Sequence, residues 1–300
     1  MAEHDRILVG IDGGEGGRAA IRHAAERAGR SGAGLWLVHV IDLAIATGVF
    51  YPYGYSGLAD QIREAGATAL EHAEKEAAEL VGAENVTTTL LDGGVVTELV
   101  HAAADSTMVV LGDERHHGLS RIVTGSVTGR VASRAPVPVV IVPAAWPDAR
   151  EARDARMVVV AVADCDTSTD LVARALAEAV DRGGGLVIVH GWDVPAVYYE
   201  STLGQLDAAG LAADARHQLM QTLERARQLV PNSAGVDAWI EVRRGQPARV
   251  VAEATKKAAL LVIGRRGHAF PLRRLGGTGH ALLRESACPV EVVPPVSSTP

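Results

Sequence analysis

The chain repeats itself, and this repeat limits the possible fold more than any other feature of the sequence. The run LWLVHV at 35–40 recurs as LVIVHG at 186–191, an offset of 151 residues. Three more anchors follow in the same order at offsets of 151 or 152: VVLG at 109–112 with LVIG at 261–264, Gly125-Ser126 with Gly277-Thr278, and PVVIVP at 138–143 with PVEVVP at 289–294. Ordered anchors at one offset predict two copies of one domain, at 1–145 and 156–300, with a linker at 146–155.

Within each half, short apolar runs alternate with longer segments of helical period, which is typical of βαβ units. In the first half we expect strands at 6–11, 35–41, 86–90, 108–111 and 137–142, and helices at about 16–30, 62–81, 95–104 and 125–134. Continuous apolar strands suit burial on both faces. The predicted fold is therefore α/β, with two tandem doubly wound domains, each a five-stranded parallel sheet in the order 3-2-1-4-5 with helices on both faces.

Composition narrows the function classes. There are 29 Lys and Arg against 36 Asp and Glu, a net charge of −7, which argues against nucleic acid or an anionic membrane as the main partner. The sequence shows no apolar signal segment and no long apolar run, so we expect a cytoplasmic protein. Two isolated cysteines predict neither a disulfide framework nor a metal site, and His116-His117 lacks a third ligand.

In a sheet of this order, ligands bind beyond the carboxyl ends of strands one and four, where the strand order reverses. The first strand is followed by Asp12 and then by four glycines within five residues. Asp12 can accept from a ligand amino or hydroxyl group, or it can simply cap the turn into the helix. The fourth strand ends at Gly112, and Gly125-Ser126 is expected to open a helix. Its first turn would offer backbone N–H groups and hydroxyls to a phosphate, although Ser126 can also be an ordinary cap.

One spacing links these loops to a known family. In the second half, Gly264-x-x-Gly267-x9-Gly277-Thr278 resembles the ATP-binding signature of the universal stress protein family. The first half has the same frame, with Arg115 in place of the second glycine. The resemblance covers nearly all of both halves, including a first strand ending in Asp and the Ala-Pro-Val-Pro-Val segment before the last strand.

The resemblance implies a set of binding residues in each half. In this family an Asp after the first strand and the backbone after the second strand meet adenine, while the glycine loop and the following hydroxyls hold the phosphates. In the first half the matching positions are Asp12, Val40, Leu111, Gly112, Arg115, Gly125, Ser126, Val127 and Thr128. In the second half the candidates are Asp164, Gly191, Ile263, Gly264, Gly267, Gly277, Thr278, Gly279 and His280, with Ala163 at the position that matches Asp12.

The resemblance also implies a function. It predicts an ATP-binding regulatory or stress-adaptation protein that takes ATP with Mg²⁺ and hydrolyses it slowly at most. The residues suggest no catalytic nucleophile, and no P-loop lysine motif is present. Two alternatives stay open: a relative that has lost ATP binding and serves as an interaction module, and an adenylating α/β enzyme.

Other expectations concern partners and single residues. We expect the two halves to pack as a pseudo-dimer, and a homodimer is possible, because the last strands are expected to lie at sheet edges. No regulatory protein partner can be named. His39 and His190 are expected to be satisfied residues at or near the core. The aromatic loop at 50–55 and its counterpart at 197–199 can either cover a purine or form a dimer contact.

Overall fold

A computed structural model describes residues 5–43, 57–113, 121–146, 156–165, 168–193, 207–265 and 275–295, and the side chains of 121–126 are left undescribed. The chain forms two compact units. The described residues up to 146 belong to the first unit and those from 156 onward to the second. Most of the predicted linker and the aromatic loop at 50–55 lie outside the described residues, as do 197–199 and His116-His117.

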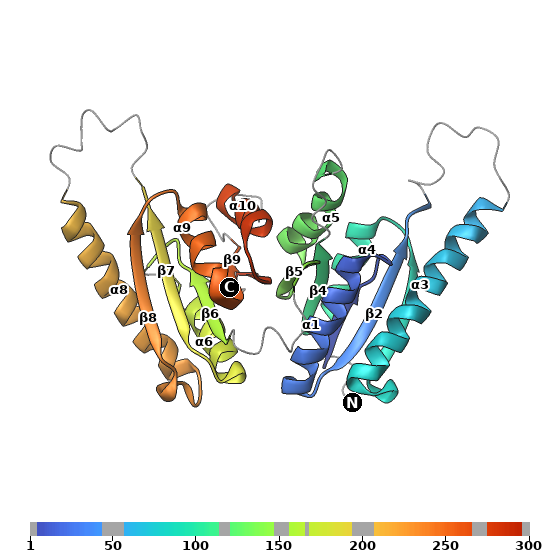
Figure 1. The fold of residues 1–300 in the computed structure, drawn as a ribbon, viewed down its shortest axis with the longest axis horizontal. Coiled ribbons are helices and arrows are strands. Elements are labelled where there is room, and N and C mark those ends of the chain that lie inside the picture. The colour runs from blue at the N-terminus through green and yellow to red at the C-terminus, as the bar shows by residue number, and fades with distance from the viewer. Residues whose placement is uncertain are drawn as a thin grey trace, which may run out of the picture. The chain divides into compact units, whose positions relative to one another are not determined.

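The first unit alternates strands and helices along the chain (Figure 1). Its elements are β1 (Arg6–Gly10), α1 (Glu15–Ser31), β2 (Gly34–Ile41), α3 (Leu58–Val81), β3 (Val86–Asp92), α4 (Val95–Ala102), β4 (Met108–Asp113), α5 (Arg121–Arg134) and β5 (Val139–Pro143).

The second unit repeats this series with similar lengths. Its elements are β6 (Met157–Ala161), α6 (Thr169–Arg182), β7 (Leu186–Trp192), α8 (Ala208–Leu229), β8 (Ala238–Arg244), α9 (Pro247–Ala254), β9 (Ala258–Gly264), α10 (Gly277–Glu285) and β10 (Val290–Val293).

The strand order within each unit is the predicted one. The strands of the first unit lie in the order β3-β2-β1-β4-β5, all parallel, and those of the second in the order β8-β7-β6-β9-β10, also parallel. In numbers counted from the start of each unit, both orders are 3-2-1-4-5. The prediction of two tandem doubly wound α/β domains is confirmed.

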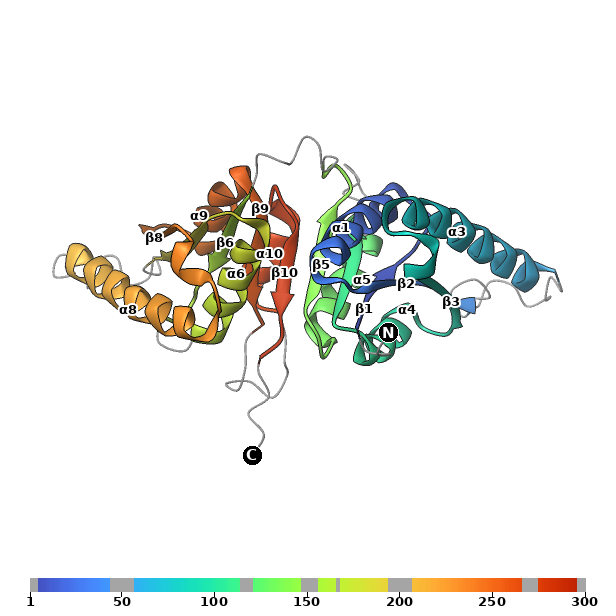
Figure 2. The same cartoon turned by 90° about the horizontal axis from the view of Figure 1, so that it is seen from below.

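Helices cover both faces of each sheet, which explains why the central strands are apolar on both sides. In the first unit, α1 and α3 pack together on one face, and α4 and α5 pack together on the other (Figure 2). The core under α1 joins large strand residues such as Ile7 and Leu37 to small helix residues such as Ala20 and Ala24. In the second unit, α6 and α8 cover the matching face, with Leu176 and Leu219 fully buried. Among the described helices, none combines the length and the apolar character that crossing a membrane needs.

One helix start differs from the prediction. We expected a helix to open at Gly125, but α5 begins at Arg121. The residues from Arg121 to Thr124 include no proline or glycine, so nothing local stops the helix from beginning earlier. In the second unit α10 does begin at Gly277, and its N-cap residue Gly276 separates it from the buried Leu275.

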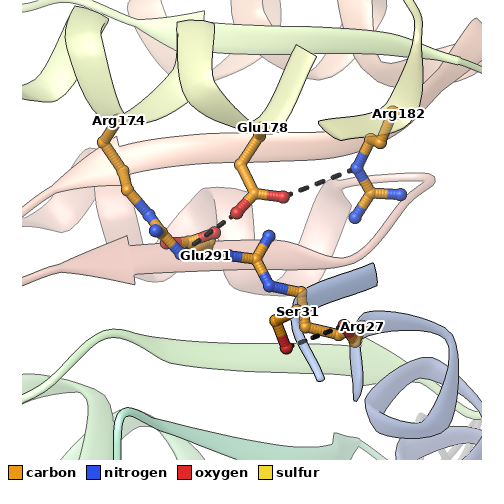
Figure 3. A network of polar contacts seen from close by, with 6 residues as sticks. All are labelled: Arg27, Ser31, Arg174, Glu178, Arg182 and Glu291. Atoms are coloured by element: carbon orange, nitrogen blue, oxygen red, sulfur yellow. Dashed lines mark hydrogen bonds and ion pairs between the residues drawn. The ribbon is translucent and has the colours of Figure 1, made fainter. Parts of the chain in front are cut away.

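The second unit also contains a buried ionic network that joins α6 to β10 (Figure 3). The Arg174 guanidinium lies 2.6 Å from Glu291 Oε1 and 3.0 Å from Glu178 Oε1, and both carboxylates are only 1% exposed. Burial alone would lower the pKa of Arg174, but the charges of Glu291 and Glu178 outweigh burial, so this pKa is raised. Arg174 therefore stays charged and compensates two buried carboxylates. Figure 3 also draws Arg27 and Ser31 of α1, where the Ser31 hydroxyl donates to the Arg27 carbonyl.

Candidate functional site

The expected crevice lies at the carboxyl end of β1, which pairs with β2 on one side and β4 on the other. The last rung of both ladders is at Gly10, which lies opposite Val38 and Leu111. Beyond this point the chain leaves β1 while β2 and β4 continue, so the strand end opens between its two neighbours. The residues at these three strand ends make up the candidate site of the first unit.

Asp12 lies at the centre of this opening. It is exposed, and its Oδ1 accepts a hydrogen bond from the Gly14 N–H at 2.9 Å. Gly13, between them, has a φ of 83°, a left-handed conformation that glycine adopts at little cost. This bond folds the turn that leads into α1, but Asp12 does not cap the helix, because the N-cap residue is Gly14 and it has no side-chain cap. No described residue hydrogen-bonds the other oxygen, so the same carboxylate can also accept from a ligand.

The backbone of Val40 faces the same opening. In β2, the even-numbered residues exchange hydrogen bonds with β1, as the Gly34 N–H to Asp5 O and the Ile11 N–H to Val38 O bonds show. Backbone groups of a strand in a parallel sheet alternate between its two neighbours. The N–H and C=O of Val40 therefore point to the side of β1, beyond the place where β1 ends. Val40 is partly exposed.

Gly112, at the end of β4, has a packing role. A Cβ built on it would lie 2.1 Å from the carbonyl carbon and the carbonyl oxygen of Gly16 in α1. The helix and the strand thus approach each other backbone to backbone, and only a glycine fits. Leu111, one residue earlier, is 4% exposed, and its side chain is in the core.

The expected phosphate loop of the first unit is described only in part. Arg115 lies outside the described residues, and the surroundings of Gly125 and of the Ser126 side chain are not described either. Because α5 begins at Arg121, Gly125 to Thr128 belong to its second turn. Backbone N–H groups in the second turn of a helix bond within the helix, so the prediction that these residues open the helix is wrong. Val127 and Thr128 are half-buried.

In the second unit the matching strand end carries a different residue. The Val162 N–H donates to Val189 O at 2.9 Å, as the Ile11 N–H does to Val38 O, so the register is the same in both units. This places Ala163 where the first unit has Asp12, and Asp164 where it has Gly13. The Ser168 hydroxyl donates to the backbone carbonyl of Asp164.

The other candidates of the second unit are spread over three elements. Gly191 of β7 takes the place of Val40. Ile263 and Gly264 end β9, and a Cβ on Gly264 would lie 3.3 Å from Leu171 Cδ2. The helix α10 begins at Gly277 after Gly276, with no side-chain cap, and a Cβ on Gly277 would meet no atom of the described residues within 4 Å outside its own helix turn. This is an open helix N-terminus, with the exposed residues Thr278 and His280 and the half-buried Gly279 in its first turn. Gly267 lies outside the described residues.

The two strand histidines lie closer to the site than expected. His39 Nδ1 lies 2.8 Å from Ile11 O, and His190 Nδ1 lies 2.9 Å from Val162 O. Both are partly buried and hydrogen-bonded, so the prediction of satisfied histidines near the core is confirmed. Their contact with the strand end was not predicted. The signal was available, because a polar residue at the same place of both repeats is unusual within an apolar strand.

The comparisons with known proteins agree with this architecture. The sequence model of the universal stress protein family matches residues 3–143 and again 155–294. A universal stress protein of Mycolicibacterium smegmatis is 30% identical over 298 residues, covering 96% of this chain and 97% of its own. One of Mycobacterium tuberculosis is 30% identical over 294 residues, covering 95% and 96%. The crystal structure of a universal stress protein from Archaeoglobus fulgidus has the same fold, with a TM-score of 0.70, 18% identity, and coverage of 97% of this chain and 98% of that one. This chain therefore belongs to the universal stress protein family and carries two copies of the family's domain in tandem.

Proposed function

We propose that the first unit binds ATP at the carboxyl end of β1. The observation that carries this proposal is the pairing of an exposed carboxylate with an unclosed strand edge: Asp12 follows β1 directly, and the backbone of Val40 points into the same opening. A carboxylate oxygen accepts from amino and hydroxyl groups, and a strand N–H and C=O together offer one donor and one acceptor. Adenine and ribose present groups of both kinds.

The phosphates would then extend toward α5. Of the residues that the family resemblance assigns to them, we propose Gly112, Arg115 and the hydroxyls of Ser126 and Thr128, because the Gly125 N–H bonds within α5. Mg²⁺ would enter with the phosphates, because the described residues contain no cluster of three His, Cys, Asp or Glu side chains that could hold a metal ion. Hydroxyl and phosphate oxygens are ligands that Mg²⁺ accepts.

For the second unit, we propose a weaker site that favours the phosphate end. It has the open N-terminus of α10 at Gly277 but carries Ala163 where the first unit has Asp12. Binding to either unit would serve a regulatory or stress-adaptation role with slow hydrolysis at most. Such a role would act through packing of the two halves as a pseudo-dimer, or of two chains as a homodimer.

Equilibrium binding of ATP, with and without Mg²⁺, tests the proposal. Asp12→Asn keeps an oxygen for the Gly14 N–H but removes the charge, so it should weaken ATP binding by about tenfold or more without unfolding the turn. Glu15→Gln is the matched control, because it removes the charge of another exposed carboxylate three residues later, in the first turn of α1, and leaves the Asp12 carboxylate intact. Wild-type protein that binds no ATP at millimolar concentration would overturn the proposal and favour an interaction module.

Gly277→Ala reports on the second unit. Because a Cβ there meets no atom in the described part of the chain, this variant should fold normally. If it weakens ATP binding, the loss comes from the ligand and the second unit is occupied. A turnover of about one per minute is slow compared with the usual range of enzymes. Turnover well above that rate would instead support an enzyme.

A further inference from the structure

The strand histidines end the hydrogen-bond ladder at the site. Ile11 lies just beyond β1, and its N–H still donates to Val38 O at 2.9 Å. In a continuing parallel ladder, the Ile11 carbonyl would next accept from the Val40 N–H. Among the described residues no such backbone bond exists. The Ile11 carbonyl accepts from the imidazole of His39 instead, at 2.8 Å.

The surroundings of His39 keep its imidazole hydrogen-bonded to the Ile11 carbonyl. A carbonyl oxygen can only accept, so His39 Nδ1 carries the hydrogen. The ring is held in place from its other side by α3, where a Cβ on Gly66 would lie 2.8 Å from His39 Cδ2 and 3.0 Å from Nε2. Glycine at position 66 thus makes room for the ring, and the ring has little freedom to leave the Ile11 carbonyl.

The second unit repeats the arrangement. The Val162 N–H donates to Val189 O, and the Val162 carbonyl lies 2.9 Å from His190 Nδ1. Gly191 then stands where the first unit has Val40. The surrounding residues differ between the units, so the same side-chain bond at the same rung is a property of the strand end and not of one particular packing arrangement.

We propose that His39 is a positioning residue that keeps the Val40 backbone open for the nucleobase. A carbonyl oxygen can accept two hydrogen bonds, so the imidazole acts through direction: it holds the Ile11 carbonyl toward His39, and the ladder does not close by one more rung. The Val40 N–H and C=O stay directed at the opening beside Asp12, where they can distinguish one base from another. This inference rests on the proposed function for its ligand, but the ladder itself can be tested without any ligand.

The first experiment measures amide hydrogen exchange by NMR in the ligand-free full chain. In His39→Leu the Ile11 carbonyl loses its side-chain donor, so the Val40 N–H should bond to it and exchange at least about fivefold more slowly, the effect of about one net hydrogen bond. His39→Asn places an amide donor near the position of Nδ1 and should keep the wild-type rate. An unchanged Val40 rate in His39→Leu overturns the inference.

The second experiment compares the binding of ATP, GTP and inorganic tripolyphosphate. His39→Leu should weaken ATP binding about tenfold and reduce the preference for ATP over GTP, because base contacts are lost. It should leave tripolyphosphate binding unchanged, which general destabilisation would not do. The Asn variant should restore the preference. Unchanged ATP selectivity in His39→Leu contradicts the positioning role.

His190→Leu is the matched control. It should slow exchange of the Gly191 N–H in the same way. It should leave ATP binding to the first unit unchanged, because His190 lies in the second unit, where Ala163 stands in the place of the carboxylate. Equal losses of ATP binding in both Leu variants would point to a structural role for these histidines and against the inference. If the wild type binds no ATP, the proposed function and the selectivity part both fail, and the exchange rates still decide whether His39 ends the ladder.

Discussion

Gly112 and Gly16 meet backbone to backbone where β4 and α1 cross. The carbonyl group of Gly16 occupies the space that any side chain at position 112 would need, because a Cβ there would lie 2.1 Å from its carbon and oxygen atoms. This contact brings α1 close to the strand end that carries the candidate site. The first glycine of the family signature is thus required by the fold of this unit, whether or not a phosphate also approaches it.

Substituting this glycine should damage the first unit. Gly112→Ala forces backbone to move against backbone, and we expect a loss of about 2–3 kcal/mol of stability, in the upper range for overpacking. Gly264→Ala is the matched control, since the nearest described atoms to its Cβ belong to the flexible side chain of Leu171, the first at 3.3 Å, and it should cost less than about 1 kcal/mol. Denaturant unfolding measures both losses, with amide exchange of β1 and β4 as the local measure for Gly112→Ala and of β6 and β9 for Gly264→Ala. Equal, small losses would contradict the backbone contact.

Removing Arg174 should weaken the charge compensation of two buried carboxylates, of which Glu178 keeps Arg182 at 3.6 Å from its Oε2. We expect Arg174→Met to destabilise the second unit by about 3 kcal/mol, at the lower end for broken buried pairs because the arginine side chain is 27% exposed. The unfolding free energy of the full chain checks this. Adding Glu291→Val, which places the residue found at the matching position Val140, should recover part of the loss. A double variant that is less stable than Arg174→Met would show that Glu291 has a stabilising role of its own.

A single hydroxyl connects α8 to the strand end of the second unit. Thr222 is fully buried, and its hydroxyl donates to the Cys165 carbonyl at 2.7 Å while accepting from Arg225 Nη2 at 2.9 Å. Thr222→Val keeps the shape and removes both bonds, so it should cost about 1–3 kcal/mol. Thr222→Ser keeps the hydroxyl and should cost less. Thermal or denaturant unfolding compares the two, and a Val variant as stable as the Ser variant would refute the role of the hydroxyl.

Both cysteines should resist modification in the native protein. Cys165 is 7% exposed and Cys288 is fully buried, and a thiol reagent can reach neither without local opening. Labelling should be slow in buffer and should reach two thiols per chain in denaturant. Intact-mass measurement over time gives the number of labels per chain, and peptide mapping after digestion gives the rate for each site. Fast labelling of either cysteine in buffer would show that its surroundings open readily.

The sequence alone determined the repeat, the two doubly wound domains and the order of their strands. It could do so because apolar runs of strand length and helical periods are local patterns, and the 151-residue offset appears when the sequence is compared with itself. None of these patterns requires knowledge of tertiary contacts. The placement of Asp12 and Val40 at the carboxyl ends of neighbouring strands followed from topology, since parallel strands end at one edge.

Tertiary structure decided the details that depend on contacts between distant segments. The start of α5 at Arg121 was not predicted, because a Gly-Ser pair reads as a helix opening although glycine is tolerated within a helix at modest cost. The packing role of Gly112 depends on Gly16, which lies far from it in the sequence, so spacing alone could not show it. His39 was correctly predicted as a satisfied residue at or near the core, but only the fold shows that its partner is the Ile11 carbonyl, because the relative register of the two segments is not specified by the sequence alone.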